Sequence, residues 1–482
     1  MKDALFIDSF SSLPAKEQQL FLRFVDSPYF NTDKKLVTLL QWIMTQAPGQ
    51  LDRAHADAFL FPGETFQYDR ITNHISYLQR LLERFLAQEE WQRHSRQPLL
   101  WGIKASQRRG MSRLFSRLVG KWDRLSDKGR PVETEDLVDQ QEVVFQRNQQ
   151  MMRLGLRESD RSLVERARLL RDCAMLARLS NTCQWLTLSQ VLTIEEADQA
   201  LMEQEIEELK TQSAAFTDHP HILLYRHILL MLLHPEEDGN YRTFRSLLHQ
   251  FTGVDADRRT LFQYAQNYCI QRINRGNQDY LPELFVLYQD MLERGLLYEE
   301  GEISGSDVKN IVSLGVRLKE FAWTESFLTK TAPHVPADQQ EISLQYNRAY
   351  LLEAMGEARE AMRMLAGVEF PDIFYQLGAR VILIKCYYRL RDLEGLESAI
   401  HSFAGWLRRN RQVSAYQRKV HLNLLRFTRK LAMLRARLQL FSHTEQQRQL
   451  DLLGKQIRQT AEITNISWVL EQVEGLRGKL PG

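Results

Sequence analysis

The stretch ISLQYNRAYLLEAMGEAREAMRMLAGVEFPDIFYQ, residues 342–376, decides the fold that this sequence predicts. Small residues and larger apolar residues recur in it at the spacing of a helix face. Small side chains let two antiparallel helices approach closely, and larger apolar side chains fill the seam between them. The residues that carry the pattern are Ala349, Leu352, Gly356, Ala358, Ala361 and Leu365, with Pro371 beyond them.

This pattern resembles a tetratricopeptide repeat (TPR), a pair of antiparallel helices that stacks on similar pairs. A second unit follows 35 residues later, where Ile384 is in register with Ala349, but Arg391 and Leu396 stand where the first unit has small residues. A weaker unit precedes both, so the resemblance covers about residues 310–410. It implies a right-handed α-solenoid whose surface binds peptides or helices of partner proteins without doing chemistry.

The rest of the chain is also predicted to be helical. Glycine (23) and proline (13) are scarce among the 482 residues, and no window alternates with period two for long enough to demand a sheet. Apolar residues at helical spacing predict four helices within residues 14–90. We therefore expect an all-α protein with an N-terminal helical domain (1–92), a basic connector with an amphipathic helix (93–131) and a TPR-like right-handed α-solenoid of antiparallel helix pairs (132–482).

A long helix is predicted near the C-terminus. Seven apolar residues from Val420 to Phe441 keep a 4-3-4-3 spacing, which places them on one seam. The flanking residues offer no opposite charges for a self-pairing coiled coil. We therefore expect the seam to pack on preceding helices and the chain to be a monomer or a weak oligomer. Ser442 and Glu445 form a capping-box pattern that opens the next helix.

Composition indicates a cytoplasmic protein. The four cysteines are scattered and form no Cys-x-x-Cys pair, which is typical of a reducing compartment. The first residues lack the sustained apolar run of a signal peptide. The most apolar stretch, residues 222–233, contains Arg226 and is shorter than the roughly 20 residues that a membrane span needs. We expect no membrane span.

Motifs of common enzyme classes are absent from the sequence, which contains no Gly-x-Gly, no P-loop, no Gly-x-Ser-x-Gly and no His-Glu-x-x-His. Arg242 and His249 match a loose Arg-x6-His pattern that resembles helical HEPN ribonucleases, but twelve histidines and many arginines give such matches by chance. The histidines from His219 to His234 offer ligands to a metal ion, although a helix that starts at Pro220 and partly buries them explains them more simply. We predict a non-catalytic protein with no catalytic, metal or cofactor site.

Positive charge is concentrated in two blocks, although the formal net charge is only +2. Residues 93–130 contain eleven lysines or arginines and two acids, and residues 398–444 contain ten and no acid. In the first block four cations recur every four residues, so we expect them to share one face of a helix with an apolar face elsewhere. The cations are Arg109, Arg113, Arg117 and Lys121, and the apolar residues are Met111, Leu114, Leu118, Trp122 and Leu125.

Several interpretations of this basic stripe stay open. It can bind the phosphates of a nucleic acid, bind an acidic protein, or lie against an acidic segment of the same chain. A membrane surface fits less well, since the apolar side is needed for the core. In the second block Trp406 and Tyr416 interleave with cations, as base stacking requires, but aromatic residues at helical spacing usually belong to a core. The cations of the second block are Arg408, Arg409, Arg411, Arg418 and Lys419.

A Ser-Pro-Tyr-Phe-Asn segment near the N-terminus raises a question of burial. Pro28 disfavours helical geometry at the residue before it, so the first helix is expected to end there, and Asn31 or Thr32 can cap the next helix. We expect Tyr29 and Phe30 to pack into this corner, and an exposed docking loop is the alternative. The segment is similar to that of uncharacterised bacterial proteins, a likeness that implies no activity or site residue.

These observations favour a cytoplasmic scaffold or adaptor that binds partner peptides or helices on a solenoid surface and uses no cofactor. The alternative is a nucleic-acid-binding regulator that uses the basic blocks at 93–130 and 398–444. The two hypotheses differ in the salt dependence that they predict for binding.

Overall fold

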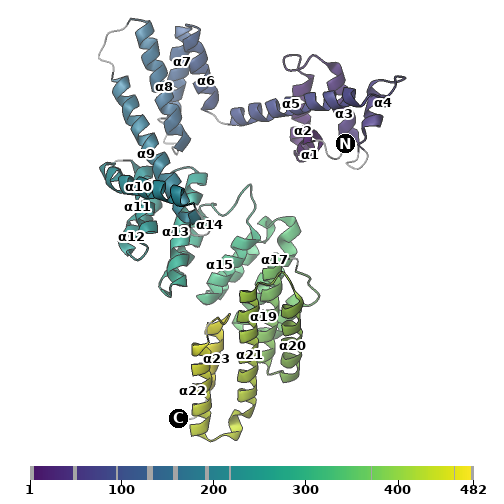
Figure 1. The fold of residues 1–482 in the computed structure, drawn as a ribbon, viewed down its shortest axis with the longest axis vertical. Helices are drawn as coiled ribbons and strands as arrows, with labels where there is room; N and C mark the ends of the chain where they lie inside the picture. The colour runs from purple at the N-terminus through teal and green to yellow at the C-terminus, as the bar shows by residue number, and fades with distance from the viewer. Residues whose placement is uncertain are drawn as a thin grey trace. The chain divides into compact units, whose positions relative to one another are not determined.

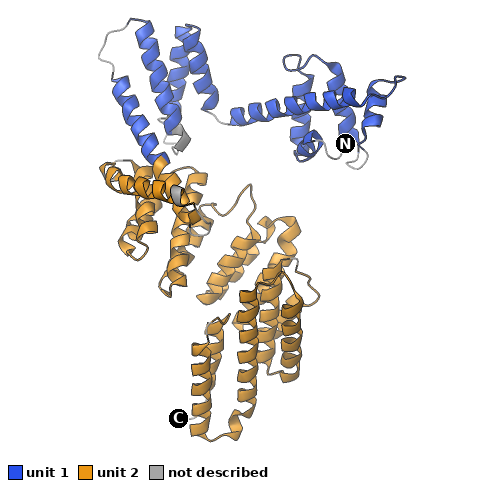
Figure 2. Ribbon diagram, viewed as in Figure 1, with its two compact units in different colours: residues 1–177 blue, residues 178–482 orange. Residues whose placement is uncertain are grey.

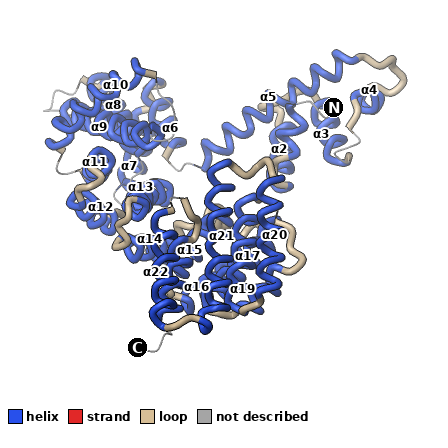
Figure 3. The backbone as a smooth tube through the Cα atoms, turned by 60° about the horizontal axis from the view of Figure 1, so that its bottom comes forward, coloured by secondary structure: helices blue, strands red, loops and turns tan. Residues whose placement is uncertain are grey.

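Every regular element in the part of the chain that the computed structural model describes is helical, so the all-α prediction is confirmed (Figure 1, Figure 3). No helix in this part is both long and apolar enough to cross a membrane. The chain divides into two compact units, residues 1–177 and 178–482 (Figure 2). The described residues are 5–46, 51–93, 96–126, 134–155, 161–189, 195–216, 219–370, 372–460 and 462–478.

Five helices begin the first unit, and their apolar faces meet in one core that contains the almost fully buried Phe6, Phe21 and Phe85. Four of them match the helices predicted from apolar spacing. The first helix was not predicted, because its seven residues are too few to show a periodic face. The helices are α1 (Leu5–Ser11), α2 (Ala15–Asp26), α3 (Lys34–Thr45), α4 (Arg53–Leu60) and α5 (Tyr68–Arg93).

The corner between α2 and α3 follows the prediction at one end only. Ser27 caps the C-terminus of α2 in an extended conformation, as the following Pro28 requires. The prediction that Asn31 or Thr32 caps α3 is wrong, because the N-cap is Asp33, whose carboxylate accepts a hydrogen bond from the backbone N–H two residues later at 2.8 Å.

The two aromatic residues of this corner have different environments. Phe30 stacks on Phe24 with ring centroids 4.0 Å apart and packs against the core. Tyr29 is 85% exposed. Asn31 ties the corner together, because its Nδ2 donates to the carbonyl of Val25 at 3.0 Å. The packed-corner interpretation therefore holds for Phe30, whereas Tyr29 faces solvent.

The remainder of the first unit contains a second, smaller core between α6, α7 and α8, formed by Leu100, Ile103, Phe115, Trp122 and Val143. The next helix, α9, begins in the first unit and ends in the second. The helices are α6 (Gln97–Arg108), α7 (Ser112–Ser126), α8 (Thr134–Arg153) and α9 (Ser162–Ser189).

The second unit continues with helices that each pack on the next one along the chain from α11 to α15. Pro220 is the first residue of α11, as predicted for a first turn. The N-cap of α11 is His219, and Asp218, which has the side chain of a typical N-cap, lies outside the described residues. The elements are α10 (Glu196–Gln212), the 3-10 helix η1 (Ser213–Ala215), α11 (Pro220–Leu233), α12 (Asp238–Gln250), α13 (Asp255–Asn274) and α14 (Tyr280–Glu293).

Four consecutive helix pairs follow, and a last helix ends the unit. The predicted pair at 342–376 corresponds to α17 and α18, with the left-handed Gly356 (φ +100°) between them. The first helices of the pairs, α15, α17, α19 and α21, also pack against one another in that order, and we name them the lead-helix row. The elements are α15 (Gly305–Arg317), α16 (Phe321–Thr331), η2 (Ala332–His334), α17 (Ala337–Met355), α18 (Ala358–Leu365), α19 (Ile373–Leu390), α20 (Leu393–Arg409), α21 (Ala415–Arg437), η3 (Leu438–Leu440), α22 (His443–Gln459) and α23 (Ile466–Arg477).

Five of the seven seam residues lie on α21, but the prediction of one helix to Phe441 is wrong, because α21 ends at Arg437 and Leu438 belongs to η3. Leu424, Phe427 and Leu431 are at most 1% exposed and share a core with residues of α19, α20, α22 and α23. Ser442 caps α22 by accepting from the N–H of Glu445 at 3.4 Å, which is one half of the predicted capping box, whereas the Glu445 carboxylate accepts from Nε2 of Gln449 at 2.7 Å. The seam therefore packs on helices of the same chain.

Candidate functional site

A cavity of about 320 Å³ opens on the lead-helix row, and we name it the row pocket. Its wall comes from α15, α17, α19 and α21 and from the turn before α23, so it draws on residues from 309 to 465. The described residues that line it include two lysines and one histidine and no aspartate or glutamate. Leu377, Val381 and Ile382 supply a buried apolar floor.

Gly378 sets the distance between α17 and α19 beside this pocket. A methyl group at Gly378 would overlap the hydroxyl of Tyr346 and would lie 2.8 Å from Cζ and 2.9 Å from Cε2 of that ring. Tyr346 is held in place by an edge-to-face contact with Tyr375 at 4.8 Å between centroids. The hydroxyl of Tyr375 in turn donates to the carbonyl of Gly305 at 3.2 Å, which ties α19 to α15.

Lys309 is a half-buried cation in the wall of the row pocket. Its Nζ lies 4.7 Å from the ring centroid of Tyr375 and 5.5 Å from that of Tyr346, close enough for cation–π attraction. No ion pair joins it to a carboxylate of the described chain, although Asp372 attracts it at longer range. Burial lowers the pKa of its ammonium group, as expected for a cation without a close counter-ion.

Lys385 is the second lysine of the pocket and belongs to a buried charge cluster. Its Nζ lies 3.6 Å from one carboxylate oxygen of Glu353, and the side chains are 7% and 3% exposed. Arg389, one turn further along α19, lies 3.5 Å from the other oxygen of the same carboxylate. One buried carboxylate therefore neutralises part of the charge of two cations.

The pocket also offers hydrogen-bond acceptors. Asn347 is fully buried, and its Nδ2 donates to the carbonyl of Ser343 at 2.8 Å, while its Oδ1 has no partner. The Nδ1 of His421 lies 2.7 Å from the carbonyl of Gln417, so this nitrogen carries the proton and Nε2 can accept. Burial lowers the pKa of His421, which keeps the ring neutral at pH 7.

The predicted basic stripe is divided between two helices. Arg109 is the C-terminal cap of α6, and the following Gly110 (φ +68°) starts a turn, so the prediction that it shares a helix with the other cations is wrong. Arg113, Arg117 and Lys121 do lie on α7, and all three are exposed.

The apolar face predicted for this helix is also displaced. Met111 and Leu114 are 49% and 43% exposed, whereas Phe115, which was not predicted, is buried beside Trp122. The helix starts only at Ser112, after a turn at Gly110 that interrupts the predicted continuous helix. Leu118 is half-buried against the same core, and Leu125 is half-buried as well.

The second basic block contains cations of two kinds. Arg418 donates to the carbonyls of Leu407 and Val413, and Lys419 forms an ion pair with Glu462, so both belong to the local structure. Three others are exposed, and no ion pair connects them to a described carboxylate. These are Arg408, Arg409 and Arg411.

The two aromatic residues of this block differ in the same way. Trp406 is half-buried under the guanidinium of Arg380 at 4.1 Å, whereas Tyr416 is 62% exposed. Tyr416 alone is therefore available for stacking.

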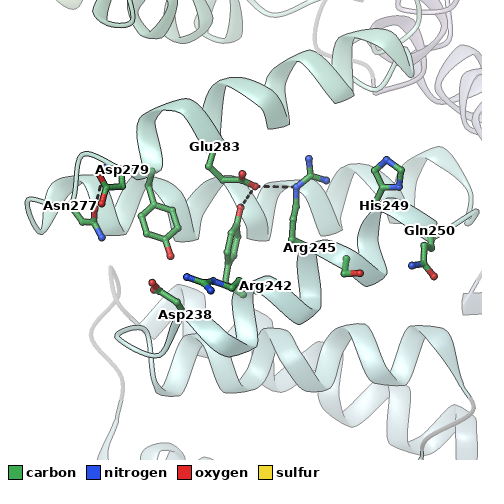
Figure 4. Close-up of a pocket in the computed structure, with 11 residues that line it drawn as sticks. Asp238, Arg242, Arg245, His249, Gln250, Asn277, Asp279 and Glu283 are labelled. Carbon is green, nitrogen blue, oxygen red and sulfur yellow. Dashed lines mark hydrogen bonds and ion pairs between the residues drawn. The ribbon is translucent and has the colours of Figure 1, made fainter.

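A second cavity, of about 660 Å³, lies between α12 and α14 (Figure 4). Arg245 pairs there with Glu283 and Asp290, and the hydroxyl of Tyr241 donates to Glu283 at 2.8 Å. Arg242 and His249 line the cavity, but the described contacts give neither a catalytic partner. The half-buried charges of Arg245, Glu283 and Asp290 are thus paired with one another, although Nη1 of Arg245 has no hydrogen-bond partner among the described residues.

Among the histidines around α11, His219 and His221 are neighbours with ring centroids 5.9 Å apart. His221 packs edge-to-face on Phe251 and lies 3.6 Å from Asp257. Burial lowers the pKa of His227. Within the described ranges, His234 groups with Glu236 and Glu237, whose carboxylates face solvent, and such exposed acidic groups are common without an ion.

Sequence reasoning missed the row pocket, because its side chains come from helices more than a hundred residues apart. One local signal was available, namely Gly378, a glycine within an apolar helical pattern and without turn residues around it.

In comparisons with known proteins, no family model, no curated protein and no solved structure matches the chain.

Proposed function

We propose that this protein is a non-catalytic interaction scaffold that binds a segment of a partner protein in the row pocket. The observation that carries the proposal is a pocket built by four successive lead helices with an apolar floor and no acidic side chain among its described residues. Stacked helix pairs commonly present such surfaces to extended peptides. The TPR-like pattern of the sequence supports the same proposal.

The polar groups of the pocket suit a peptide. A peptide carries both N–H donors and C=O acceptors, and the pocket offers Lys309 as a donor and Asn347 and His421 as acceptors. Phe374, 54% exposed at the rim, adds an apolar contact of the kind that dominates binding hot spots.

The titratable groups favour binding over covalent chemistry. Burial raises the pKa of Cys269 and of Cys386 to about 12, so neither is a thiolate at neutral pH. The neutral imidazole of His421 has no hydroxyl or thiol nucleophile among its described hydrogen-bond partners. These features support a non-catalytic function.

The proposal is tested by selecting peptides from a random library on the full chain and measuring their affinities by fluorescence anisotropy. Lys309→Gln and Phe374→Ala are expected to weaken binding about tenfold, as truncation of a hot-spot residue does. Lys330→Gln and Leu440→Ala are matched controls at exposed positions outside the pocket and should leave affinity unchanged. Equal losses in all four variants would contradict the proposal.

A nucleic-acid-binding regulator is the second candidate. It is favoured by Arg113, Arg117 and Lys121, which are exposed on one helix and form no ion pair with a carboxylate in the described ranges. Binding to generic duplex or single strands should then weaken log-linearly with salt, and charge reversal at Arg113 and Arg117 should reduce that slope. Salt-insensitive binding, or none at physiological ionic strength, would remove this candidate.

A further inference from the structure

A third hollow, of about 540 Å³, lies where the ends of α19 and α21 meet α22 and α23. We name it the arginine pocket, because three arginines and three glutamines line it and its described residues include no aspartate or glutamate. It is separate from the row pocket. The arginines are Arg389, Arg391 and Arg435, and the glutamines are Gln439, Gln446 and Gln472.

Arg435 is a half-buried cation whose guanidinium contacts neutral groups in the described part of the chain. It donates to the backbone carbonyl of Tyr388 at 2.5 Å, and its Cζ lies 3.9 Å from the centroid of the Tyr388 ring. No ion pair links it to a carboxylate in the described ranges. Burial, together with the neighbouring charge of Arg391, lowers the pKa of this guanidinium, against the attraction of Tyr388. Removing a charge from water without a counter-ion costs free energy, so the unpaired, half-buried Arg435 calls for an explanation.

The end of α19 explains part of this positive charge. The last carbonyls of a helix attract cations, and Arg391, the left-handed C-cap of α19 (φ +59°), stands beside them. The C-terminal end of a helix carries the equivalent of about −0.5 elementary charge. Three arginines gather here, so the helix end offsets only part of their charge. Among the three, Arg389 alone pairs with a described carboxylate, that of Glu353, which it shares with Lys385.

Two carboxylates of α22 and α23 are paired with other cations, and Asp392, next to Arg391, caps α20 by accepting from the N–H of Gly395 at 2.9 Å. Glu474 pairs with Arg458 and with Arg477, and Arg477 also pairs with Asp451. Glu474 and Asp451 are therefore engaged by arginines that do not line the pocket. Arg391 and Arg435 are left without an anionic partner among the described side chains.

We propose that the arginine pocket binds a phosphate group. A phosphate monoester carries a charge of about −1.5 to −2 at pH 7, which matches two unpaired arginines better than the single charge of a carboxylate does. Its three oxygens can accept from more than one planar guanidinium. The side-chain amides of Gln439 and Gln472 add neutral donors at the wall. This site goes beyond the proposed function and stands independently of the row pocket.

Inorganic phosphate is the first probe, added to the full chain at constant ionic strength and followed by calorimetry, with acetate and chloride as controls. Phosphate should bind, and Arg391→Gln should weaken it about ten- to a hundredfold, the effect of losing one charge-assisted hydrogen bond. Arg348→Gln, at an exposed position of α17 away from the pocket, is the matched control and should bind as the wild type does. Because Arg435 also holds the end of α19, the exposed Arg391 is the decisive position.

Two further probes distinguish the source of the phosphate, a peptide with phosphoserine and adenosine monophosphate. The probe that binds with the higher affinity identifies the source of the phosphate. Equal affinity for both probes and for inorganic phosphate indicates a site for the free ion. In each case Arg391→Gln must weaken binding. The inference is overturned if acetate binds as well as phosphate, if Arg391→Gln binds phosphate as the wild type does, or if no phosphate binds. Peptides selected for the row pocket should bind Arg391→Gln normally, so failure of one proposal is distinguishable from failure of the other.

Discussion

Gly378→Ala is the most informative single substitution in the lead-helix row. In a helix interior this change normally stabilises by about 1 kcal/mol, because alanine has the higher helix propensity. Here the new methyl group would overlap the hydroxyl of Tyr346 and approach Cζ to 2.8 Å. Tyr346 is only 6% exposed and packs on Tyr375, so its ring cannot swing away without disturbing the contact between α17 and α19.

The magnitude follows from these two opposing effects. Overpacking a close contact costs about 1–3 kcal/mol, from which the propensity gain of about 1 kcal/mol is subtracted. We expect Gly378→Ala to destabilise by about 0–2 kcal/mol. Gly475→Ala, in α23 of the same unit, is the matched control, because its methyl group would have no atom within 4 Å, and it should stabilise slightly. The difference between the two variants, about 1–3 kcal/mol, isolates the close approach of α17 and α19.

Urea unfolding followed by circular dichroism measures this difference, with the m-values compared to check that both variants unfold in the same way. Tyr346→Phe removes the nearest clashing atom, so it should rescue part of the loss in the double variant, and the two effects should not add. If Gly378→Ala proves as stabilising as Gly475→Ala, the described contact between α17 and α19 is wrong.

Three further predictions concern burial and charge. Glu353→Gln leaves the buried Lys385 unpaired and should lower the free energy of unfolding by about 3–5 kcal/mol in urea unfolding. The control Glu397→Gln breaks a largely exposed pair and should cost at most about 1 kcal/mol. Similar losses in the two variants would contradict the claim that Glu353 and Lys385 form a buried pair. Phe30→Ala should cost about 1–3 kcal/mol and Tyr29→Ala less than about 0.5 kcal/mol, and a reversed order would show that the corner is packed differently. Folding lowers the pKa of His421, so the unfolded chain binds the proton more tightly, and the contribution of His421 to stability is present above about pH 6.5 and lost as the pH falls. His421→Gln should therefore reduce the pH dependence of the unfolding free energy between pH 7 and 5. An unchanged pH dependence would refute this prediction.

The sequence predicted what depends on neighbouring residues. Apolar spacing located α17 and α18, and the effect of Pro28 located the end of α2. The predictions failed where two local signals compete. Asp33 displaced Asn31 as the cap of α3, and the turn at Gly110 separated cations whose spacing alone suggested one continuous helix.

The candidate site was beyond local patterns. Lys309, Asn347 and His421 reach one pocket only because α15, α17, α19 and α21 pack in a row, and no short stretch of sequence contains two of them. The absence of acids among the described residues of that pocket is likewise a property of the folded chain. The half-burial of Arg435, a residue of α21, beside the end of α19 could not be predicted from local patterns either, since its hydrogen-bond partner is Tyr388, 47 residues earlier.

The central claim is that the row pocket holds a partner polypeptide, and site-specific photo-crosslinking tests it most directly. p-Benzoylphenylalanine replaces Phe374 at the rim of the pocket, or Leu440, which is 82% exposed and outside it. In the native host we expect one reproducible protein adduct from position 374, resistant to nuclease and reduced by Lys309→Gln, and none of that identity from position 440. The same adducts from both positions, or adducts that disappear with nuclease, would contradict the account.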